Sequence, residues 1–112
     1  MVFDSKKIVY SAEDNWDELV SITFVDNDQY LSFNALTYEN EIEIELNDQA
    51  NYISVNKSDF RYELTARALH VTIEKPIVER NFPGLKFVVN HEADDVEKLT
   101  RVMNVLLKNN EP

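Results

Sequence analysis

The feature that most constrains the fold is a strict alternation of polar and apolar residues in successive short runs. From Glu41 to Leu46 every second residue is Glu, and the residues between them are Ile42, Ile44 and Leu46. A period of two places one set of side chains on each face of a β-strand. The apolar set indicates a face packed on a core, and the glutamates indicate a face directed to solvent.

The same alternation predicts further strands, separated by short polar turns. The runs that we expect as strands are 6–12, 18–26, 29–36, 52–55, 60–66, 68–75 and 85–89. Residues 26–29 are expected to form a turn, because Asn and Asp accept tight backbone conformations. Residues 47–51 are expected to form a loop, and the polar residues 56–59 the turn of a hairpin.

The final segment, residues 94–110, changes its period. Its apolar residues recur with helical spacing, and they are Val96, Leu99, Val102, Met103, Leu106 and Leu107. Asp94, followed by Glu97, resembles a capping box at the start of a helix. The order of elements predicts an α+β fold, an antiparallel β meander with a C-terminal helix packed on one face. The length of 112 residues suits a single domain spanning residues 1–112.

Negative charge is concentrated in the first half of the chain. The net charge is −10, and no Lys or Arg occurs from Ile8 to Asn56. Because phosphate backbones are bound through cations, this distribution argues against nucleic-acid binding. It suits a positively charged protein, which such a field would steer toward the surface. The alternative is surplus charge that serves solubility alone.

Glu41, Glu43 and Glu45 are expected to lie about 6.7 Å apart along one strand face. This face is either plainly solvated, or an internal salt-bridge ladder to which Arg61 could contribute, or a docking surface for a cationic partner. Trp16, the only tryptophan, either anchors such a partner or packs inward. The other candidate contact residues are Asp14, Asp17, Asp26 and Asp28.

Sequence motifs for catalysis and for cofactor binding are missing. The single glycine, Gly84, leaves no phosphate-binding loop, and His70 and His91 lack the spacing of metal ligands. We therefore expect a protein that is not an enzyme and holds no cofactor and no metal. The sequence shows neither a secretory signal nor an apolar run of membrane-spanning length. This predicts a cytoplasmic protein without a membrane partner.

The order of features over residues 29–107 resembles the immunity protein 10 family of bacterial polymorphic toxin systems. The resemblance is carried first by Leu46–Asn51 and Val55, in which Gln49, Asn51 and Val55 form the skeleton Q-x-N-x-x-x-V. It continues in the runs 69–73 and 85–89, and in a helix that opens with Asp-Asp-Val-Glu-Lys-Leu at residues 94–99.

The resemblance implies a small cytoplasmic α+β protein that binds and neutralises a cognate bacterial toxin and has no catalytic residue. Many toxin domains are nucleases, which need a basic surface for their substrate. An acidic inhibitor can occlude such a surface after fast, electrostatically steered association. The alternative function is an acidic adaptor or regulatory module without a toxin partner.

Overall fold

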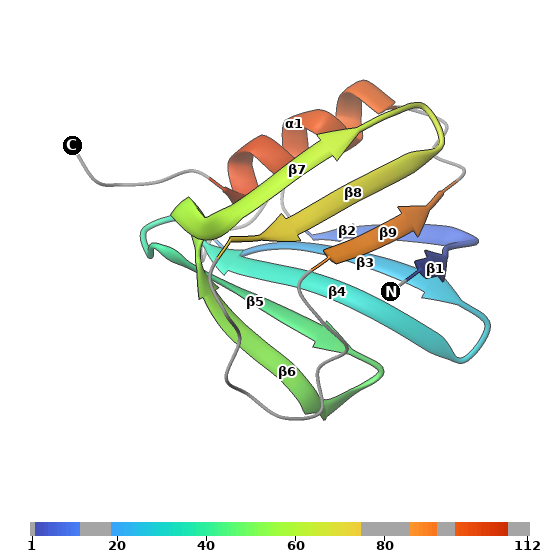
Figure 1. The fold of residues 1–112 in the computed structure, drawn as a ribbon, viewed down its shortest axis with the longest axis horizontal. Helices are drawn as coiled ribbons and strands as arrows, with labels where there is room; N and C mark the ends of the chain where they lie inside the picture. The colour runs from blue at the N-terminus through green and yellow to red at the C-terminus, as the bar shows by residue number, and fades with distance from the viewer. Residues whose placement is uncertain (1, 12–18, 75–85, 92–95, 108–112) are drawn as a thin grey trace.

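The computed structural model describes residues 2–11, 19–74, 86–91 and 96–107, which form two β-sheets and one helix (Figure 1). The larger sheet has five strands, which are neighbours in chain order and pair antiparallel throughout. They are β2 (Lys7–Ser11), β3 (Leu19–Asp26), β4 (Gln29–Leu36), β5 (Glu41–Leu46) and β6 (Asp48–Asn56). The described chain is therefore mostly antiparallel β-structure with one helix, an α+β arrangement.

The second sheet has four strands in the order β1-β9-β8-β7. Their bounds are β1 (Val2–Asp4), β7 (Phe60–Leu64), β8 (Ala68–Ile73) and β9 (Lys86–Asn90). The pairs β7–β8 and β8–β9 are antiparallel, whereas β1 pairs parallel with β9. The sequence predicted neither β1 nor a parallel pair, because three residues are too few for an alternation to be visible.

The chain passes between the sheets at two places. After β1, the amide of Ser5 donates to Asn90 O in the smaller sheet, and the amide of Lys6 donates to Val25 O in the larger one. After β6, a short 3-10 helix, η1 (Lys57–Asp59), leads into β7. The prediction of a hairpin at residues 56–59 is therefore wrong, since β6 and β7 belong to different sheets.

Two asparagines in the left-handed backbone region form the corners of the larger sheet. Asn27, at φ 52°, lies in the turn between the paired residues Asp26 and Gln29, which confirms the predicted turn. Asn47 has φ 65°, and β6 begins directly after it. The prediction of a loop over residues 47–51 is thus wrong for 48–51. Asparagine tolerates this conformation because its short amide bonds locally.

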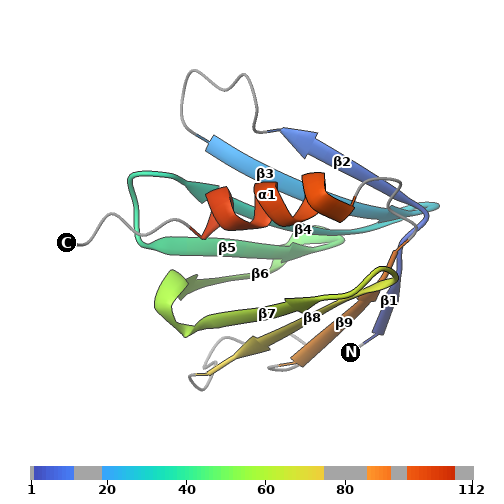
Figure 2. The same cartoon turned by 90° about the horizontal axis from the view of Figure 1, so that it is seen from above.

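The core lies between the two sheets, where their inner apolar side chains meet. Phe33 of β4 lies at its centre, with its ring edge-on to Phe24 at 6.0 Å and to Phe60 of β7 at 5.6 Å. Each of these rings is almost fully buried, and burying one large side chain stabilises the fold by roughly 1.5–3 kcal/mol. Figure 2 shows the two sheets as the arms of a V that meet where β1 runs into β2, with the helix between them.

The helix α1 (Val96–Leu106) completes this core. It presents to the sheets a row of buried residues, namely Leu99, Val102, Met103 and Leu106. Tyr62 of β7 donates a 2.6 Å hydrogen bond to Asn104, and the ammonium of Lys98 lies 4.9 Å from the ring of Tyr10 on β2. The predicted buried face is confirmed at its centre, but Val96 is only half-buried. The predicted cap residue Asp94 lies outside the described residues.

Candidate interaction surface

The three glutamates of β5 lie on the outer face of the five-stranded sheet. Ile42 and Ile44, between them, are fully buried on the inner face. Glu41 and Glu43 are exposed, and Glu45 is half-buried. With alternate residues of a strand about 6.7 Å apart, the three glutamates follow one another along one face of β5. We call these three residues the glutamate row.

The row is surrounded by neutral side chains. On β4, Asn34 is level with Glu43 and Ser32 with Glu45, and on β6, Asn56 is level with Glu41. Neither neighbouring strand places a cation opposite a glutamate. Solvent and salt screen the negative potential of the row. No positive charge on β4 or β6 reduces it further.

Neutral donors orient the two ends of the row. The phenol of Tyr30 donates a 2.6 Å hydrogen bond to Glu45, and the hydroxyl of Ser54 donates a 2.7 Å bond to Glu41. Hydrogen bonds from neutral groups hold a carboxylate without cancelling its charge. The central Glu43 makes no side-chain hydrogen bond or ion pair with the residues that the structure describes. Sequence reasoning did not identify Tyr30 and Ser54 as part of the site, because the strand register was needed to bring them to the glutamates.

The cations nearest in sequence bond to other groups. Arg61, the candidate for an internal ladder, lies in the other sheet and pairs with Glu74, with Nε 3.2 Å from the carboxylate. Lys57 is buried and donates from Nζ to Leu36 O at 3.0 Å. Burial lowers the pKa of Lys57, and the negative charge of Glu39 opposes this shift. A salt-bridge ladder along β5 does not form among the described residues.

The remaining predicted contact residues differ in their placement. Asp28 is exposed in the turn between β3 and β4. Asp26 forms an ion pair with Lys6 at 3.5 Å, so part of its charge is matched within the chain. The structure brings Asp26 and Asp28 together at the corner of the sheet near the Tyr30 end of the row, where Asn47 exchanges two hydrogen bonds with the backbone of Tyr30. Asp14, Trp16 and Asp17 lie outside the described residues.

The centre of the outer face is a small polar network next to the row. The hydroxyl groups of Thr23 and Ser32 lie 3.1 Å apart, and Ser32 donates to Asn34 at 3.3 Å. Ser32 is buried although its neighbours on this face are polar. These bonds satisfy the side chains within the sheet and give the outer face a fixed, neutral surface beside the charged strand.

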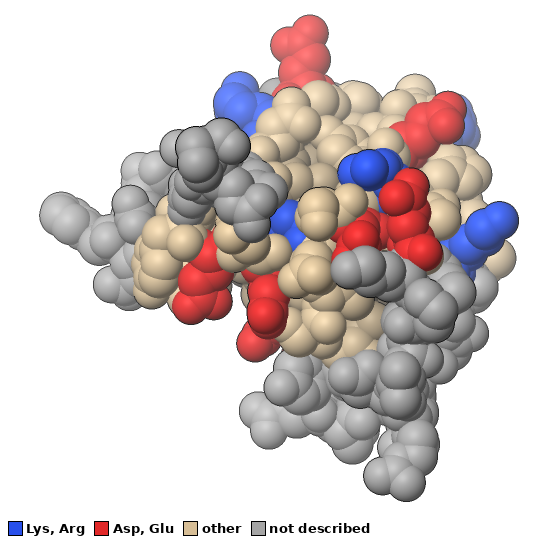
Figure 3. All heavy atoms as spheres, turned by 60° about the vertical axis from the view of Figure 1, so that its left-hand side comes forward, with Lys and Arg blue, Asp and Glu red and all other residues tan. Residues whose placement is uncertain are grey.

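Two ion pairs, Lys6–Asp26 and Arg61–Glu74, join acidic residues to cations of the described chain. On the face of the molecule in Figure 3, acidic side chains are interspersed with Lys and Arg at several places. The glutamate row differs from such mixed surface, because no cation lies on the strands beside it.

One hollow of about 390 Å³ lies at the junction of η1, β7 and the end of α1. Its described lining includes Lys57, Arg61 and Tyr62. The hydroxyl of Tyr62 is committed to Asn104, and burial raises the pKa of this phenol. Lys57 and Arg61 likewise bond within the fold, to Leu36 O and to Glu74.

No group of three or more His, Asp or Glu side chains in residues 2–11, 19–74, 86–91 and 96–107 is arranged to hold a metal ion. In the same ranges, no helix has the length and apolar character needed to traverse a bilayer.

No family model matches the chain, and no match was found among curated proteins or solved structures.

Proposed function

We propose that the protein is an immunity protein that binds a cognate, positively charged bacterial toxin domain and neutralises it by occlusion. The observation that carries the proposal is the glutamate row, three aligned carboxylates with no cation opposite them on the adjoining strands. The proposal also draws on the resemblance of residues 29–107 to the immunity protein 10 family, a resemblance in the order of apolar runs and in the opening of the helix.

The arrangement of the row favours fast docking. Aligned charges attract an oppositely charged surface from a distance and raise the association rate. Tyr30 and Ser54 hold Glu45 and Glu41 in place, so less side-chain freedom is lost when a partner binds. Inhibition then needs no catalytic step by this protein, because covering the basic surface of the toxin is sufficient. In this proposal the protein acts in the cytoplasm.

The contact surface extends from the row to the corner at Asp28. Asp14 and Asp17 are proposed to add charge at its margin, with Trp16 as an apolar anchor. Trp side chains are over-represented among residues that dominate binding energy. Asp26 is a weaker contributor, since it pairs with Lys6.

The test uses the product of the neighbouring gene as the partner and measures association by stopped-flow fluorescence at low and high salt. Reversing Glu41 and Glu43 to Lys should lower the association rate constant about tenfold or more at low salt, and the effect should shrink as salt rises. The matched control reverses Glu63 and Glu97, two exposed acids on β7 and α1, and so changes the net charge equally.

If both double variants slow association equally, the row has no specific role and only net charge matters. If neither changes the rate or its salt dependence, docking through the row is refuted. Co-expression then separates the two functions: an immunity protein rescues growth against the toxin, whereas an adaptor binds its partner without rescue.

A further inference from the structure

The turn between β4 and β5, residues 37–40, is held in place by a buried lysine. The amide of Glu39 donates to Leu36 O at 3.1 Å, and Lys57 Nζ donates to the same carbonyl at 3.0 Å. The amide of Lys57 donates to Asn40 O at 2.7 Å. Lysine is rarely buried unless its ammonium is paired, so the bonds of Lys57 account for its burial and fix both ends of the turn.

This fixed turn exposes an aromatic side chain. Tyr38 is 57% exposed, and it is the one aromatic among the large hydrophobic side chains that the described residues leave in solvent. Tyrosine is over-represented among residues that dominate binding energy. A ring on a backbone that is already ordered also loses little freedom when a partner covers it. Tyr38 therefore has the properties of an interface anchor.

The charges next to Tyr38 favour a cation as the group that covers it. Glu39 and Glu41 lie on either side of Tyr38 in the chain, and both are exposed. The charge of Glu39 acts on Lys57 and is partly compensated. Glu41 accepts a hydrogen bond from the neutral hydroxyl of Ser54 and keeps its charge. The face of an aromatic ring attracts cations as well, so the ring and the carboxylate favour the same kind of ligand.

A guanidinium group suits both the ring and the carboxylate. It is planar, stacks on aromatic faces and bonds to carboxylates through its edge, whereas the ammonium of lysine is a compact charge. We propose that the turn at residues 37–40 binds an arginine side chain of a partner protein, with the guanidinium on the ring of Tyr38 and paired with Glu41.

This inference rests on the proposed function, because the basic toxin domain is the partner that supplies the arginine. It assigns different roles to the two parts of the surface. The glutamate row raises the rate of association, and the bound arginine at the Glu41 end of the row slows dissociation.

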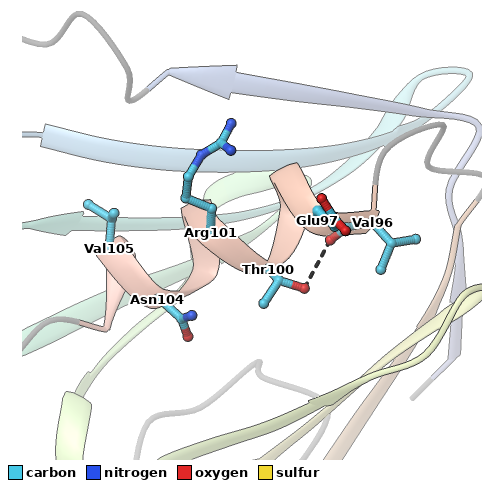
Figure 4. A pocket seen from close by; sticks show the side chains of 6 residues that line it. All are labelled: Val96, Glu97, Thr100, Arg101, Asn104 and Val105. Carbon is cyan, nitrogen blue, oxygen red and sulfur yellow. Dashed lines mark hydrogen bonds between the residues drawn. The ribbon is translucent and has the colours of Figure 1, made fainter.

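The outer side of α1 provides a comparison. An open hollow of about 570 Å³ lies there, and its described lining comes from α1 alone (Figure 4). The lining includes an acid, Glu97, and an exposed apolar residue, Val105, but also Arg101. A cation of a partner would meet the positive charge of Arg101 on this surface. Glu97 and Val105 are therefore suitable control positions for Glu41 and Tyr38.

A tetra-arginine peptide with acetylated and amidated ends is the probe, and it is titrated into the full chain at low salt. In NMR spectra, the ring resonances of Tyr38 should shift, with a dissociation constant of about 0.1–1 mM. A tetra-lysine peptide should bind severalfold more weakly, and a neutral citrulline peptide should cause no shift. Unshifted Tyr38 resonances, or equal binding of the arginine and lysine peptides, would overturn the proposal.

Substitutions assign the binding to the ring and the carboxylate. Tyr38→Leu should weaken peptide binding about three- to fivefold, whereas Tyr38→Phe keeps the aromatic face and should remain within about twofold. Glu41→Gln should weaken binding severalfold. The controls Val105→Ala and Glu97→Gln should stay within about twofold of the unchanged chain. If Tyr38→Leu binds normally, or if Glu97→Gln is as damaging as Glu41→Gln, the arginine binds elsewhere. Far-UV circular dichroism verifies that every variant remains folded.

Stopped-flow measurements with the product of the neighbouring gene separate this inference from the proposed function. Tyr38→Leu should raise the dissociation rate constant about threefold or more and change the association rate constant less than about twofold. An unchanged dissociation rate would refute the arginine site and leave the toxin proposal intact. If the gene product does not bind the unchanged chain while the peptide still shifts Tyr38, the arginine site stands and the toxin proposal fails.

Discussion

The phenol of Tyr30 donates a 2.6 Å hydrogen bond to the carboxylate of Glu45, which joins β4 to β5 on the outer face of the larger sheet. A half-buried carboxylate needs such a donor, because removing a charge from water is costly without a partner. Since the donor is neutral, Glu45 keeps its charge for the surface. Glu45 therefore contributes both to the stability of the sheet and to the negative potential of its outer face.

Replacing Tyr30 by Phe removes this hydrogen bond while the ring remains. We expect the free energy of unfolding to fall by about 1.5–3 kcal/mol, the range for a hydrogen bond to a charged group. Urea unfolding measures the change. Tyr38→Phe is the control, since Tyr38 is 57% exposed in the turn before β5 and should cost less than about 0.5 kcal/mol. Equal losses at the two positions would contradict the role of the Tyr30–Glu45 bond.

Single neutral substitutions should rank the acidic residues in partner binding. Glu43→Gln removes a charge that has no counterion among the described residues, so the association rate at low salt should fall severalfold. Asp26→Asn removes a charge already paired with Lys6 and should change the rate less. Stopped-flow measurements with the partner give both values. The reverse order would show that the corner, and not β5, dominates the encounter.

Met103 tests whether α1 is part of the core. Its side chain is fully buried between the sheets, so Met103→Ala should lower the free energy of unfolding by about 2–5 kcal/mol. Val105→Ala, on the exposed side of the same helix, is the matched control and should cost about 1 kcal/mol or less. Thermal and urea unfolding measure both. A small loss at Met103 would mean that the helix packs only loosely against the sheets.

His91 should make stability depend on pH. Burial lowers its pKa below the ordinary 6.5, although a hydrogen bond with the backbone of Thr65 opposes the shift. The unfolded chain then takes up a proton more readily than the folded one. The stability gained from the neutral imidazole is present above pH 6.5 and is lost as the pH falls through the pKa of the folded state.

Urea unfolding at several pH values between 7 and 5 measures this dependence. His91→Gln should reduce the loss of stability on acidification, because the substituted side chain does not titrate. His70→Gln, at an exposed position on β8, is the control and should leave the loss in place. An unchanged acid response in the His91 variant would assign the sensitivity to other groups.

Much of the fold could be predicted from the alternation of residues. The strands predicted at 29–36 and 41–46 have the bounds of β4 and β5, because each alternates a largely buried apolar face with a largely polar one. The buried row of α1 followed from its period. The partition into two sheets could not be predicted, since it depends on η1 and on the crossing at Ser5 and Lys6, where no periodic pattern marks the change. The start of β6 was missed because a bulge between Glu45 and Leu46 shifts the register.

The site could be predicted only in part. Alternation placed Glu41, Glu43 and Glu45 on one face, and the structure confirms that placement. The pairing of Asp26 with Lys6 was not foreseen, because Lys6 enters the larger sheet only after the chain has left β1. Tyr30 and Ser54 were likewise missed, since their distance from the glutamates depends on cross-strand register. Toxin binding by the row is a prediction from charge, and the association measurements test it.

The pairing of β1 with β9 has a consequence for synthesis on the ribosome. The larger sheet is complete in sequence once Asn56 has been added, so its five strands can assemble while the rest of the chain is still being made. The strand β1 can pair only later, because Val2 is the partner of Val88 on β9 and Asp4 accepts a hydrogen bond from Asn90. The strand of the smaller sheet that is made first therefore docks among the last, and β1 stays unpaired until β9 has been synthesised.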